Sequence, residues 1–373
     1  MAWSIRRRRS AILPAVVWMS LCGSDIGWRL PAWSRGRLVH PVKVLDRYVL
    51  DGYRLVGSCW LLIRSVSAGI RFGSASLATP SVGRMTPPDA PRNRWSDLDR
   101  PPLNTAALRR GLLRPGGLWS SLDVVEATGS TNSDLAARAT GALAEGAVLV
   151  AEEQTAGRGR LDRVWTAPPR SGLFFSVYLT PGGGVPAERW GWLPLLAGVA
   201  TATGLAQSAG VDMALKWPND LLVTVHGSER KTGGILAERA ADGVVIGIGL
   251  NVSLRAAELP APHAGSLALA GAASTDRETL LRAVLRSLEQ WYTRWRDAGG
   301  DAAESGLQAA YAAGCATLDR PVRAELPGDR SVVGEAVAID GDGRLVLATG
   351  DGLQEPVSAG DIVHLRGVEG GLT

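Results

Sequence analysis

The chain changes in character near Leu318, and this change restricts the possible folds more than any other feature of the sequence. Before Leu318, expected helices and strands alternate without a regular βαβ repeat, which indicates an α/β domain with a mixed sheet. After it, only short strands are expected, separated by turns such as Asp340-Gly341-Asp342-Gly343. Five such strands predict a small all-β barrel at the C-terminus.

Hydrophobic periodicity and capping residues place the individual elements. Helices are expected at residues 104–113, 134–143, 190–208 and 276–296. Strands of the α/β part are expected at residues 122–125, 147–151, 173–179, 213–217, 234–237 and 244–252. The barrel strands are expected at residues 321–325, 332–339, 345–348, 355–358 and 362–365. The hydroxyl and amide side chains of residues 130–133 are expected to cap the second helix.

Charge is distributed unevenly along the chain. Residues 1–84 hold 13 Lys or Arg and three Asp, a net charge of +10, so the chain total of +4 leaves −6 for residues 85–373. A basic footprint for DNA or RNA is therefore missing from the part expected to fold, and no nucleic-acid partner is expected. Only Cys315 lies in that part, which leaves no disulfide framework and no metal-ligand spacing and suits a reducing, cytoplasmic compartment.

The first 84 residues admit two interpretations. Arg6 to Arg9 followed by the apolar run Ala11 to Cys22 imitates a secretory signal, but this run is too short to span a bilayer, and no membrane partner is expected. The favoured interpretation is that the biological start is Met85. Residues 1–84 are then a non-native or disordered extension and residues 85–101 a flexible linker. The expected domains are residues 102–316, which carry the chemistry, and 317–367, the barrel.

Two residue types are scarce, and their positions point to a site. The chain has three lysines against 37 arginines, and two of the lysines, Lys216 and Lys231, lie fifteen residues apart in the expected folded part. A lysine kept where arginine predominates indicates a need for a compact ammonium. Of five asparagines, Asn132, Asn219 and Asn251 fall inside distinctive short motifs. For a single asparagine, chance placement with a capping or turn role would be the favoured explanation. For three asparagines that all fall inside motifs, it is the weaker one.

Four motifs carry the candidate chemistry. Gly129-Ser130-Thr131-Asn132 offers donors and acceptors for a neutral polar ligand, although alone it is better explained as a helix cap. The run 153–165, Glu-Gln-Thr-Ala-Gly-Arg-Gly-Arg-Leu-Asp-Arg-Val-Trp, combines glycines that let phosphates approach with arginines that neutralise them. It is not a Walker loop, and alone it could be a solvated basic loop or a nucleic-acid contact.

The remaining two motifs follow along the chain. Lys216-Trp217-Pro218-Asn219-Asp220 precedes the run 231–238, Lys-Thr-Gly-Gly-Ile-Leu-Ala-Glu. Proline forbids a central ladder position, and the charges and amide resist burial unless paired, so packing alone does not explain this string. Gly247-Ile248-Gly249-Leu250-Asn251-Val252 ends an apolar strand.

In this order, the four motifs closely resemble the catalytic domain of biotin–protein ligases of the BirA type. The resemblance covers residues 122–252 in motif detail and extends to Arg366. It implies a mixed-sheet α/β domain of the class II aminoacyl-tRNA synthetase and biotin ligase type, followed by an SH3-like barrel. It also implies an enzyme that uses ATP to activate biotin and attaches it to a lysine of a biotin carboxyl carrier domain of an acyl-CoA carboxylase.

The resemblance also implies roles for individual residues. It places biotin against Ser130, Thr131, Asn132, Gln154, Arg158, Gly159, Arg160 and Lys231. It places the nucleotide against Arg160, Arg163, Trp165, Asn219 and Asn251. The expected catalytic residues are Lys231, Arg158 and Asp220, with Mg²⁺ accompanying ATP and its protein ligands unassigned. The loop 157–163 is expected to be mobile without ligand, because glycines and like charges resist folding in isolation.

The sequence departs from the family pattern in two places. Thr232-Gly233 replaces a larger apolar residue and an alanine, which could loosen the strand behind Lys231. The helix-turn-helix that precedes the catalytic domain in some relatives has no counterpart, so repressor activity is not expected.

Three rival functions stay open on the sequence alone. A lipoate–protein ligase shares the fold and the adenylation chemistry, but the polar motif at residues 130–132 suits a ureido head better than a dithiolane. A nucleic-acid-binding regulator would use Arg6 to Arg9 and the arginine loop, against the net negative charge of residues 85–373. The C-terminal barrel could also act as an independent protein-binding module.

Overall fold

The computed structural model describes residues 49–50, 53–54 and 100–365, except residues 142, 329 and 359. Two units are distinguished, residues 1–85 and residues 86–373. In the first, strand β1 (Val49–Leu50) pairs antiparallel with strand β2 (Tyr53–Arg54). The signal-like run at residues 6–22 and the expected start at Met85 lie outside the described residues. Among the described residues, no helix has the length and apolar character to cross a membrane.

A seven-stranded mixed sheet forms the centre of the second unit. Its strands are β3 (Ser121–Thr128), β4 (Ala147–Gln154), β7 (Gly172–Leu179), β8 (Met213–Lys216), β9 (Asp220–Val225), β10 (Ser228–Ala240) and β11 (Gly243–Asn251). The order is β3-β4-β7-β11-β10-β9-β8, with β3 and β4 parallel and every other neighbouring pair antiparallel. The mixed sheet expected from the sequence is confirmed.

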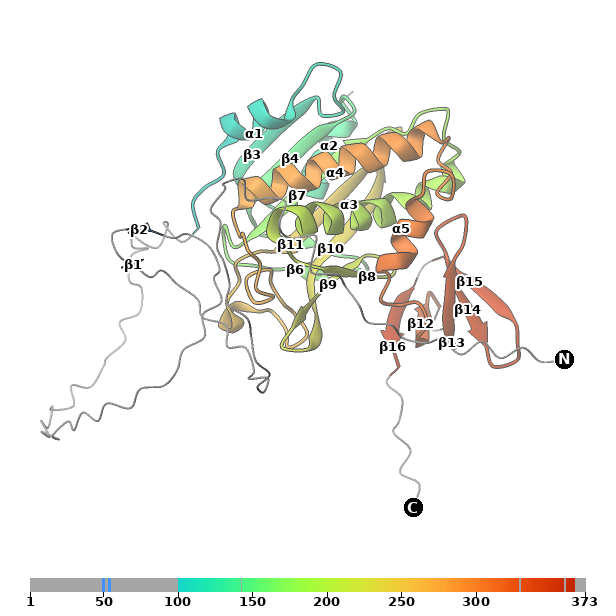
Figure 1. The fold of residues 1–373 in the computed structure, drawn as a ribbon. Coiled ribbons are helices and arrows are strands. Elements are labelled where there is room, and N and C mark those ends of the chain that lie inside the picture. The colour runs from blue at the N-terminus through green and yellow to red at the C-terminus, as the bar shows by residue number, and fades with distance from the viewer. Residues whose placement is uncertain are drawn as a thin grey trace, which may run out of the picture. The chain divides into compact units, whose positions relative to one another are not determined.

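Helices cover the two faces of this sheet unequally. Helices α3 (Trp192–Ala209) and α4 (Arg277–Asp297) lie side by side across one face, with α1 (Thr105–Leu112) beside α4 (Figure 1). Alternate strand residues such as Val148 and Val150 join the core beneath them, whereas Leu149 faces the opposite side. That opposite side packs against the short helix α2 (Thr131–Ala139). A large part of the second face is therefore left for a site.

The C-terminal residues form a separate five-stranded antiparallel sheet, which confirms the expected small β domain. Its strands are β12 (Pro321–Leu326), β13 (Arg330–Ile339), β14 (Leu345–Thr349), β15 (Gln354–Val357) and β16 (Asp361–His364). The order is β15-β14-β13-β12-β16, a meander of four strands whose fifth strand returns beside the first. The indoles of Trp192 and Trp217 donate to the carbonyls of Gly341 and Gly343, at 2.8 and 3.0 Å, and fix one turn of this sheet against the larger domain.

Three local features differ from the sequence-based expectations. Helix α2 begins at Thr131 instead of residue 134, and the Ser130 side chain makes no capping hydrogen bond, so that part of the capping prediction is wrong. Strand β9 was not expected after the Lys-Trp-Pro-Asn-Asp string. Helix α5 (Leu307–Gly314) was not expected either, because only Leu307 and Tyr311 are fully buried and the apolar pattern is short.

A buried ion pair joins the start of α4 to the end of β4. Glu152 and Arg277 have side chains that are each 6% exposed, and their closest oxygen and nitrogen lie 2.6 Å apart. Glu152 also accepts from the backbone N–H of Leu103, and Arg277 donates to the carbonyl of Pro101. Because buried charges are tolerated only when paired and hydrogen-bonded, this network fixes the end of β4, two residues before Gln154.

Candidate active site

A cavity of about 610 Å³ opens on the sheet face that carries α2. Its walls come from α2, the ends of β4, β8 and β9, the strands β10 and β11, and the hairpin of β5 (Gly157–Arg158) and β6 (Val164–Trp165). All thirteen residues singled out in the sequence line it: Ser130, Thr131, Asn132, Gln154, Arg158, Gly159, Arg160, Arg163, Trp165, Asn219, Asp220, Lys231 and Asn251. The fold thus brings four motifs that are distant in sequence around one space.

Strand register explains how the floor of the cavity is built. Lys216 lies opposite Asp220, Asp220 opposite Gly234, and Gly234 opposite Gly249, so one row crosses four strands on the same face. The two glycines leave that row open at its centre. The Trp165 indole lies over them, with ring atoms 3.5 Å and 3.1 Å from where Cβ atoms of Gly234 and Gly249 would stand. A side chain at Gly249 would therefore press on the indole.

The next row of the sheet holds the neutral polar part of the cavity. Asn132 lies over Gly247, and its Oδ1 accepts from the Ser176 hydroxyl at 2.7 Å. Its Nδ2 donates to the carbonyl of Leu236 at 3.0 Å and to Oε2 of Glu238 at 2.9 Å. Asn132 is 3% exposed, so these bonds fix the orientation of its amide.

Gln154 supplies the cap that Ser130 does not. Its Oε1 accepts from the backbone N–H of Thr131 at 2.8 Å and from the Thr131 hydroxyl at 3.1 Å, across 23 residues of sequence. The Ser176 hydroxyl, whose single proton is shared between the two acceptors, lies 2.8 Å from the same Thr131 hydroxyl and 2.7 Å from Oδ1 of Asn132. Because the Gln154 carbonyl is occupied, its amide N–H groups are the donors left for a ligand.

Cations gather at the side of the cavity formed by β8, β9 and β10. The Lys231 ammonium lies 2.6 Å from Oδ1 of Asp220, and both side chains are partly exposed to the cavity. Lys216, which lies opposite Asp220, also lines the cavity but was not assigned a role from the sequence. Burial lowers the pKa of Lys216, with Lys231 and Arg163 contributing and Asp220 opposing the shift. This side of the cavity is built for an anion.

The arginines of the hairpin each have a resident acceptor. Arg158 pairs with Glu238 at 2.9 Å, and Arg163 pairs with Asp361 of the C-terminal domain. Arg160 donates to Oδ1 of Asn219 at 3.3 Å. Burial lowers the pKa of the Arg160 guanidinium, an effect that nearby Asp220 opposes and Arg163 reinforces. An anionic ligand would have to share or displace these acceptors.

The turn of the hairpin carries two residues in the left-handed region. Leu161 and Asp162 have φ of 53° and 56°, and the Arg163 N–H donates to the Arg160 carbonyl. A positive φ at both central residues is typical of the type I′ turn, whose twist suits a two-stranded ribbon. The Leu161 side chain is 67% exposed.

Two buried polar atoms in the cavity wall have no partner among the described residues. Asn251 is 2% exposed and donates through Nδ2 to the carbonyl of Gly265 at 3.0 Å, but its Oδ1 accepts nothing. The indole N–H of Trp165 is likewise unpartnered. Since buried polar groups are nearly always satisfied, an acceptor and a donor left open beside a cavity indicate ligand contacts.

The strand behind Lys231 contains the departure noted from the sequence. Its pairing with β9 shifts register between Lys231 and Gly233, so Thr232 forms an irregularity in the ladder. Thr232 is fully buried and donates to the carbonyl of Asn251 at 3.2 Å. A Cβ at Gly233 would lie 2.8 Å from the carbonyl oxygen of Gly249. The glycine therefore permits the close approach of β10 and β11.

Sequence reasoning missed several contributors to the cavity. Lys216 was singled out for its rarity and as part of a motif but was given no role. Glu238 and Ser176, which hold the Asn132 amide, were not assigned at all. The C-terminal domain contributes Glu325, Asp361, Ile362 and Val363. No local motif marks these last residues, because their role depends on how the two domains meet. Among the described residues, no cluster of three or more His, Cys, Asp or Glu could hold a metal ion.

Comparisons with known proteins agree with this geometry. A family model described as the biotin/lipoate A/B protein ligase family matches residues 124–252, and one described as the biotin protein ligase C-terminal domain matches residues 317–365. The biotin–[acetyl-CoA-carboxylase] ligase of Mycobacterium tuberculosis is 47% identical over 274 residues, which cover 72% of this chain and 98% of that protein.

Two further relatives extend the comparison. The bifunctional ligase/repressor BirA of Escherichia coli is 33% identical over 264 residues, covering 68% of this chain and 76% of that protein. The structure of the biotin protein ligase of Aquifex aeolicus in complex with biotin and ATP superposes with a TM-score of 0.54 at 26% identity. That match covers 66% of this chain and all of the Aquifex chain.

Proposed function

Because this chain belongs to the biotin/lipoate A/B protein ligase family, we propose that it is a biotin–protein ligase. Its reaction would activate biotin with ATP as biotinyl-5′-adenylate and transfer the biotinyl group to a lysine of a biotin carboxyl carrier domain of an acyl-CoA carboxylase. A single observation carries this proposal. One cavity joins a neutral hydrogen-bonding part around Asn132 and Gln154 to a cationic part around Lys231, over a row of glycines against which the Trp165 indole packs.

The neutral part suits the ureido head of biotin. Ser130, Thr131 and Gln154 present hydroxyls and an amide at the start of α2, and the amide of Asn132 is held in a fixed orientation. A ureido group has N–H donors and a carbonyl acceptor, which such a lining can satisfy. A dithiolane offers neither, so the lining favours biotin over lipoate.

The nucleotide would lie where the wall has open polar atoms. The unpartnered Oδ1 of Asn251 can accept from an exocyclic amine such as that of adenine, and the Trp165 indole offers a stacking surface. Arg160, Arg163 and Asn219 lie on the same side of the cavity as Lys231. They would surround the phosphates and the ribose.

Activation joins two anions, so charge neutralisation dominates the chemistry. The biotin carboxylate attacks the α-phosphorus of ATP, and pyrophosphate leaves with the electron pair of the bond that breaks. In this proposal, Lys231 bridges the carboxylate and the α-phosphate. Arg158 gives up its contact with Glu238, and Arg160 its contact with Asn219, and both arginines then bind the anionic substrates. Mg²⁺ bound by the ATP phosphates would share their charge.

Transfer requires a neutral amine. The acceptor lysine attacks the carbonyl carbon of the mixed anhydride and AMP departs, so a proton must leave the ammonium first. Asp220 lies at the cavity beside Lys231 and can accept that proton or orient the amine. We assign the reaction to the cytoplasm, where the carrier domain would be met and where a single buried thiol in the described residues, Cys315, stays reduced.

A labelling assay tests the proposal directly. Purified protein is incubated with ATP, biotin and a biotin carboxyl carrier domain, and mass spectrometry measures modification of the carrier. We expect biotin-dependent labelling with release of pyrophosphate, and little labelling when lipoate replaces biotin. Efficient lipoylation would favour a lipoate ligase instead, and absence of pyrophosphate release would refute both.

The role of Lys231 has its own test. Lys231→Arg keeps the charge but replaces a compact ammonium with a planar fork, so adenylate formation should fall by about 100-fold or more. A quenched time course of biotinyl-5′-adenylate formation checks this. A wild-type rate in the variant would remove Lys231 from the mechanism.

A further inference from the structure

Lys216 is a cation of the cavity wall without a resident partner. Lys231, Arg158, Arg160 and Arg163 each bond to an acceptor, whereas the Lys216 ammonium forms no hydrogen bond or ion pair with any residue that the structure describes. It nevertheless lines the cavity and is only partly exposed. A partly buried ammonium without a counter-ion is costly unless a ligand supplies the negative charge.

The sheet register places Lys216 beside Asp220. Lys216 stands directly opposite Asp220 across the β8–β9 pair, and Lys231 approaches the same carboxylate from β10. The two lysines therefore flank Asp220 from opposite sides. Lys231 is satisfied by that carboxylate at 2.6 Å, which leaves the charge of Lys216 uncompensated by direct contact.

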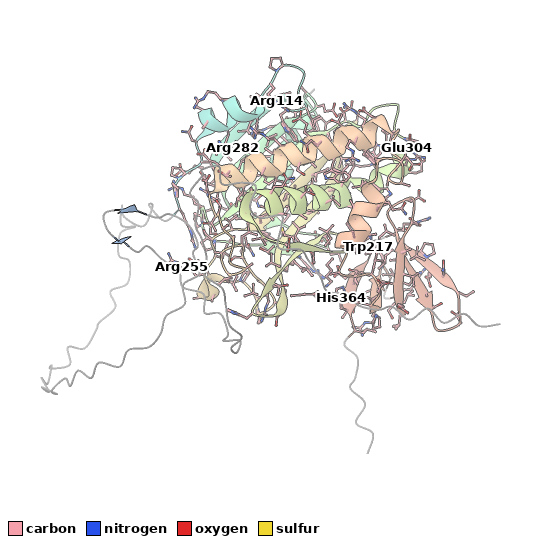
Figure 2. The ribbon with its side chains drawn as sticks, viewed as in Figure 1. Arg114, Trp217, Arg255, Arg282, Glu304 and His364 are labelled. Atoms are coloured by element: carbon pink, nitrogen blue, oxygen red, sulfur yellow. The ribbon has the colours of Figure 1, made fainter. Side chains whose placement is uncertain are left out.

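The surroundings of Lys216 contain charges of both signs. Lys231 and Arg163 lower its pKa, in addition to the effect of burial, while Asp220 and Glu229 raise it. Glu229 is itself held by Arg320 at 2.6 and 2.9 Å, so most of its charge is already neutralised. The Thr317 hydroxyl links His364 and Trp217, both labelled in Figure 2: it lies 3.2 Å from Nε2 of His364 and accepts from the backbone N–H of Trp217 at 3.1 Å. An ammonium without a direct partner, in the same cavity wall as Lys231 and Arg163, favours an anionic ligand.

We propose that Lys216 binds the β- and γ-phosphates of ATP and the pyrophosphate that leaves, while Lys231 serves the α-phosphate. This inference rests on the proposed function and assigns its two lysines to different phosphates of ATP. As the carboxylate oxygen bonds to the α-phosphorus, the bond from that phosphorus to the bridging oxygen breaks, and negative charge grows on the departing pyrophosphate. The ammonium of Lys216 stabilises that growing charge. The carrier lysine reacts after pyrophosphate has gone, so Lys216 has no part in transfer.

The two half-reactions separate this role from a general effect on the fold. Lys216→Gln keeps a polar side chain, one atom shorter, but removes the charge. We expect adenylate formation from ATP, and its reversal by added pyrophosphate, to slow by about 10- to 100-fold, the cost of losing a hydrogen bond to a charged group. Biotin transfer from supplied biotinyl-5′-adenylate to the carrier domain should stay within about twofold of the wild-type rate. Lys216→Arg should recover part of the adenylation rate.

Binding gives a readout independent of turnover. Calorimetric titration with magnesium pyrophosphate should show affinity reduced by about tenfold or more in Lys216→Gln. Arg110→Gln, which removes one positive charge from the exposed face of α1, is the matched control and should behave as wild type. Equal slowing of both half-reactions, unchanged adenylation, or unchanged pyrophosphate affinity would overturn the assignment. Failure of the wild-type protein to form any adenylate would instead refute the proposed function itself.

Discussion

Replacing Gly247 by alanine should damage the neutral part of the cavity more than its size suggests. The new Cβ would fall on the Asn132 amide, closer to Oδ1 than van der Waals contact allows and 2.9 Å from Cγ. Asn132 cannot rotate freely, because Ser176, the Leu236 carbonyl and Glu238 hold its amide on three sides. The backbone of β11 is equally constrained by β7 and β10. The amide must therefore move and give up hydrogen bonds.

The hydrogen bonds give the magnitude. Two neutral bonds contribute about 0.5–1.5 kcal/mol each, and the bond to the Glu238 carboxylate about 1.5–3 kcal/mol. With partial relaxation, Gly247→Ala should lower the free energy of unfolding by about 2–4 kcal/mol. Biotin affinity should fall by about tenfold or more, since the displaced amide also lines the cavity.

Calorimetry with biotin and thermal unfolding measure the two effects. Gly129→Ala is the matched control, because a Cβ there meets nothing within 4 Å although the residue adjoins the same motif. A double-mutant cycle with Asn132→Ala completes the test, since removing the amide removes the clash. If Gly247→Ala costs as much stability in the Asn132→Ala background as in the wild type, the reasoning is refuted.

Four further predictions follow from the same structure. Glu152→Gln leaves the Arg277 charge buried without a counter-ion and should cost about 3–5 kcal/mol of stability, measured by urea unfolding. Burial, with Lys216 and Arg320 nearby, lowers the pKa of His364 to about 4, below its unfolded value near 6.5. As the pH falls, the imidazole is therefore protonated in the unfolded chain before it is protonated in the folded protein. The free energy of unfolding should be highest above pH 6.5 and decline toward pH 4, by about 1 kcal/mol between pH 7 and 5 after allowance for solvent screening. Asp220→Asn should slow biotin transfer more than adenylate formation in single-turnover assays. Trypsin cleavage within residues 157–163 should slow when biotin and ATP are both present.

Each of these has a contrary outcome. An unchanged urea midpoint in Glu152→Gln would show that the pair is not a stabilising network. A wild-type pH dependence of stability in a His364→Gln variant would remove that histidine as the cause. Equal slowing of both half-reactions by Asp220→Asn would contradict its role in transfer. Equal proteolysis with and without ligands would contradict the expected mobility of residues 157–163 in the absence of ligand.

The sequence alone specified the local features well, because they depend on near neighbours. The 3.6-residue pattern of residues 276–296 and the N-cap Asp276 predicted α4, whose cap donor is the Thr279 N–H at 3.1 Å. The short alternating strands and turns after Leu318 predicted the small β domain for the same reason. The scarcity of lysine and asparagine pointed to residues that the fold places around one cavity.

Only the tertiary structure decided which partner each polar side chain finds. Ser130 reads as a cap in sequence, yet Gln154 from β4 reaches the Thr131 N–H instead. Lys216 and Lys231 carry the same charge, but only the register of β8, β9 and β10 gives one of them the Asp220 carboxylate. The physical reason is that propensity and periodicity act within a few residues, whereas buried donors, acceptors and charges must be satisfied by whatever the packed strands bring within hydrogen-bond distance.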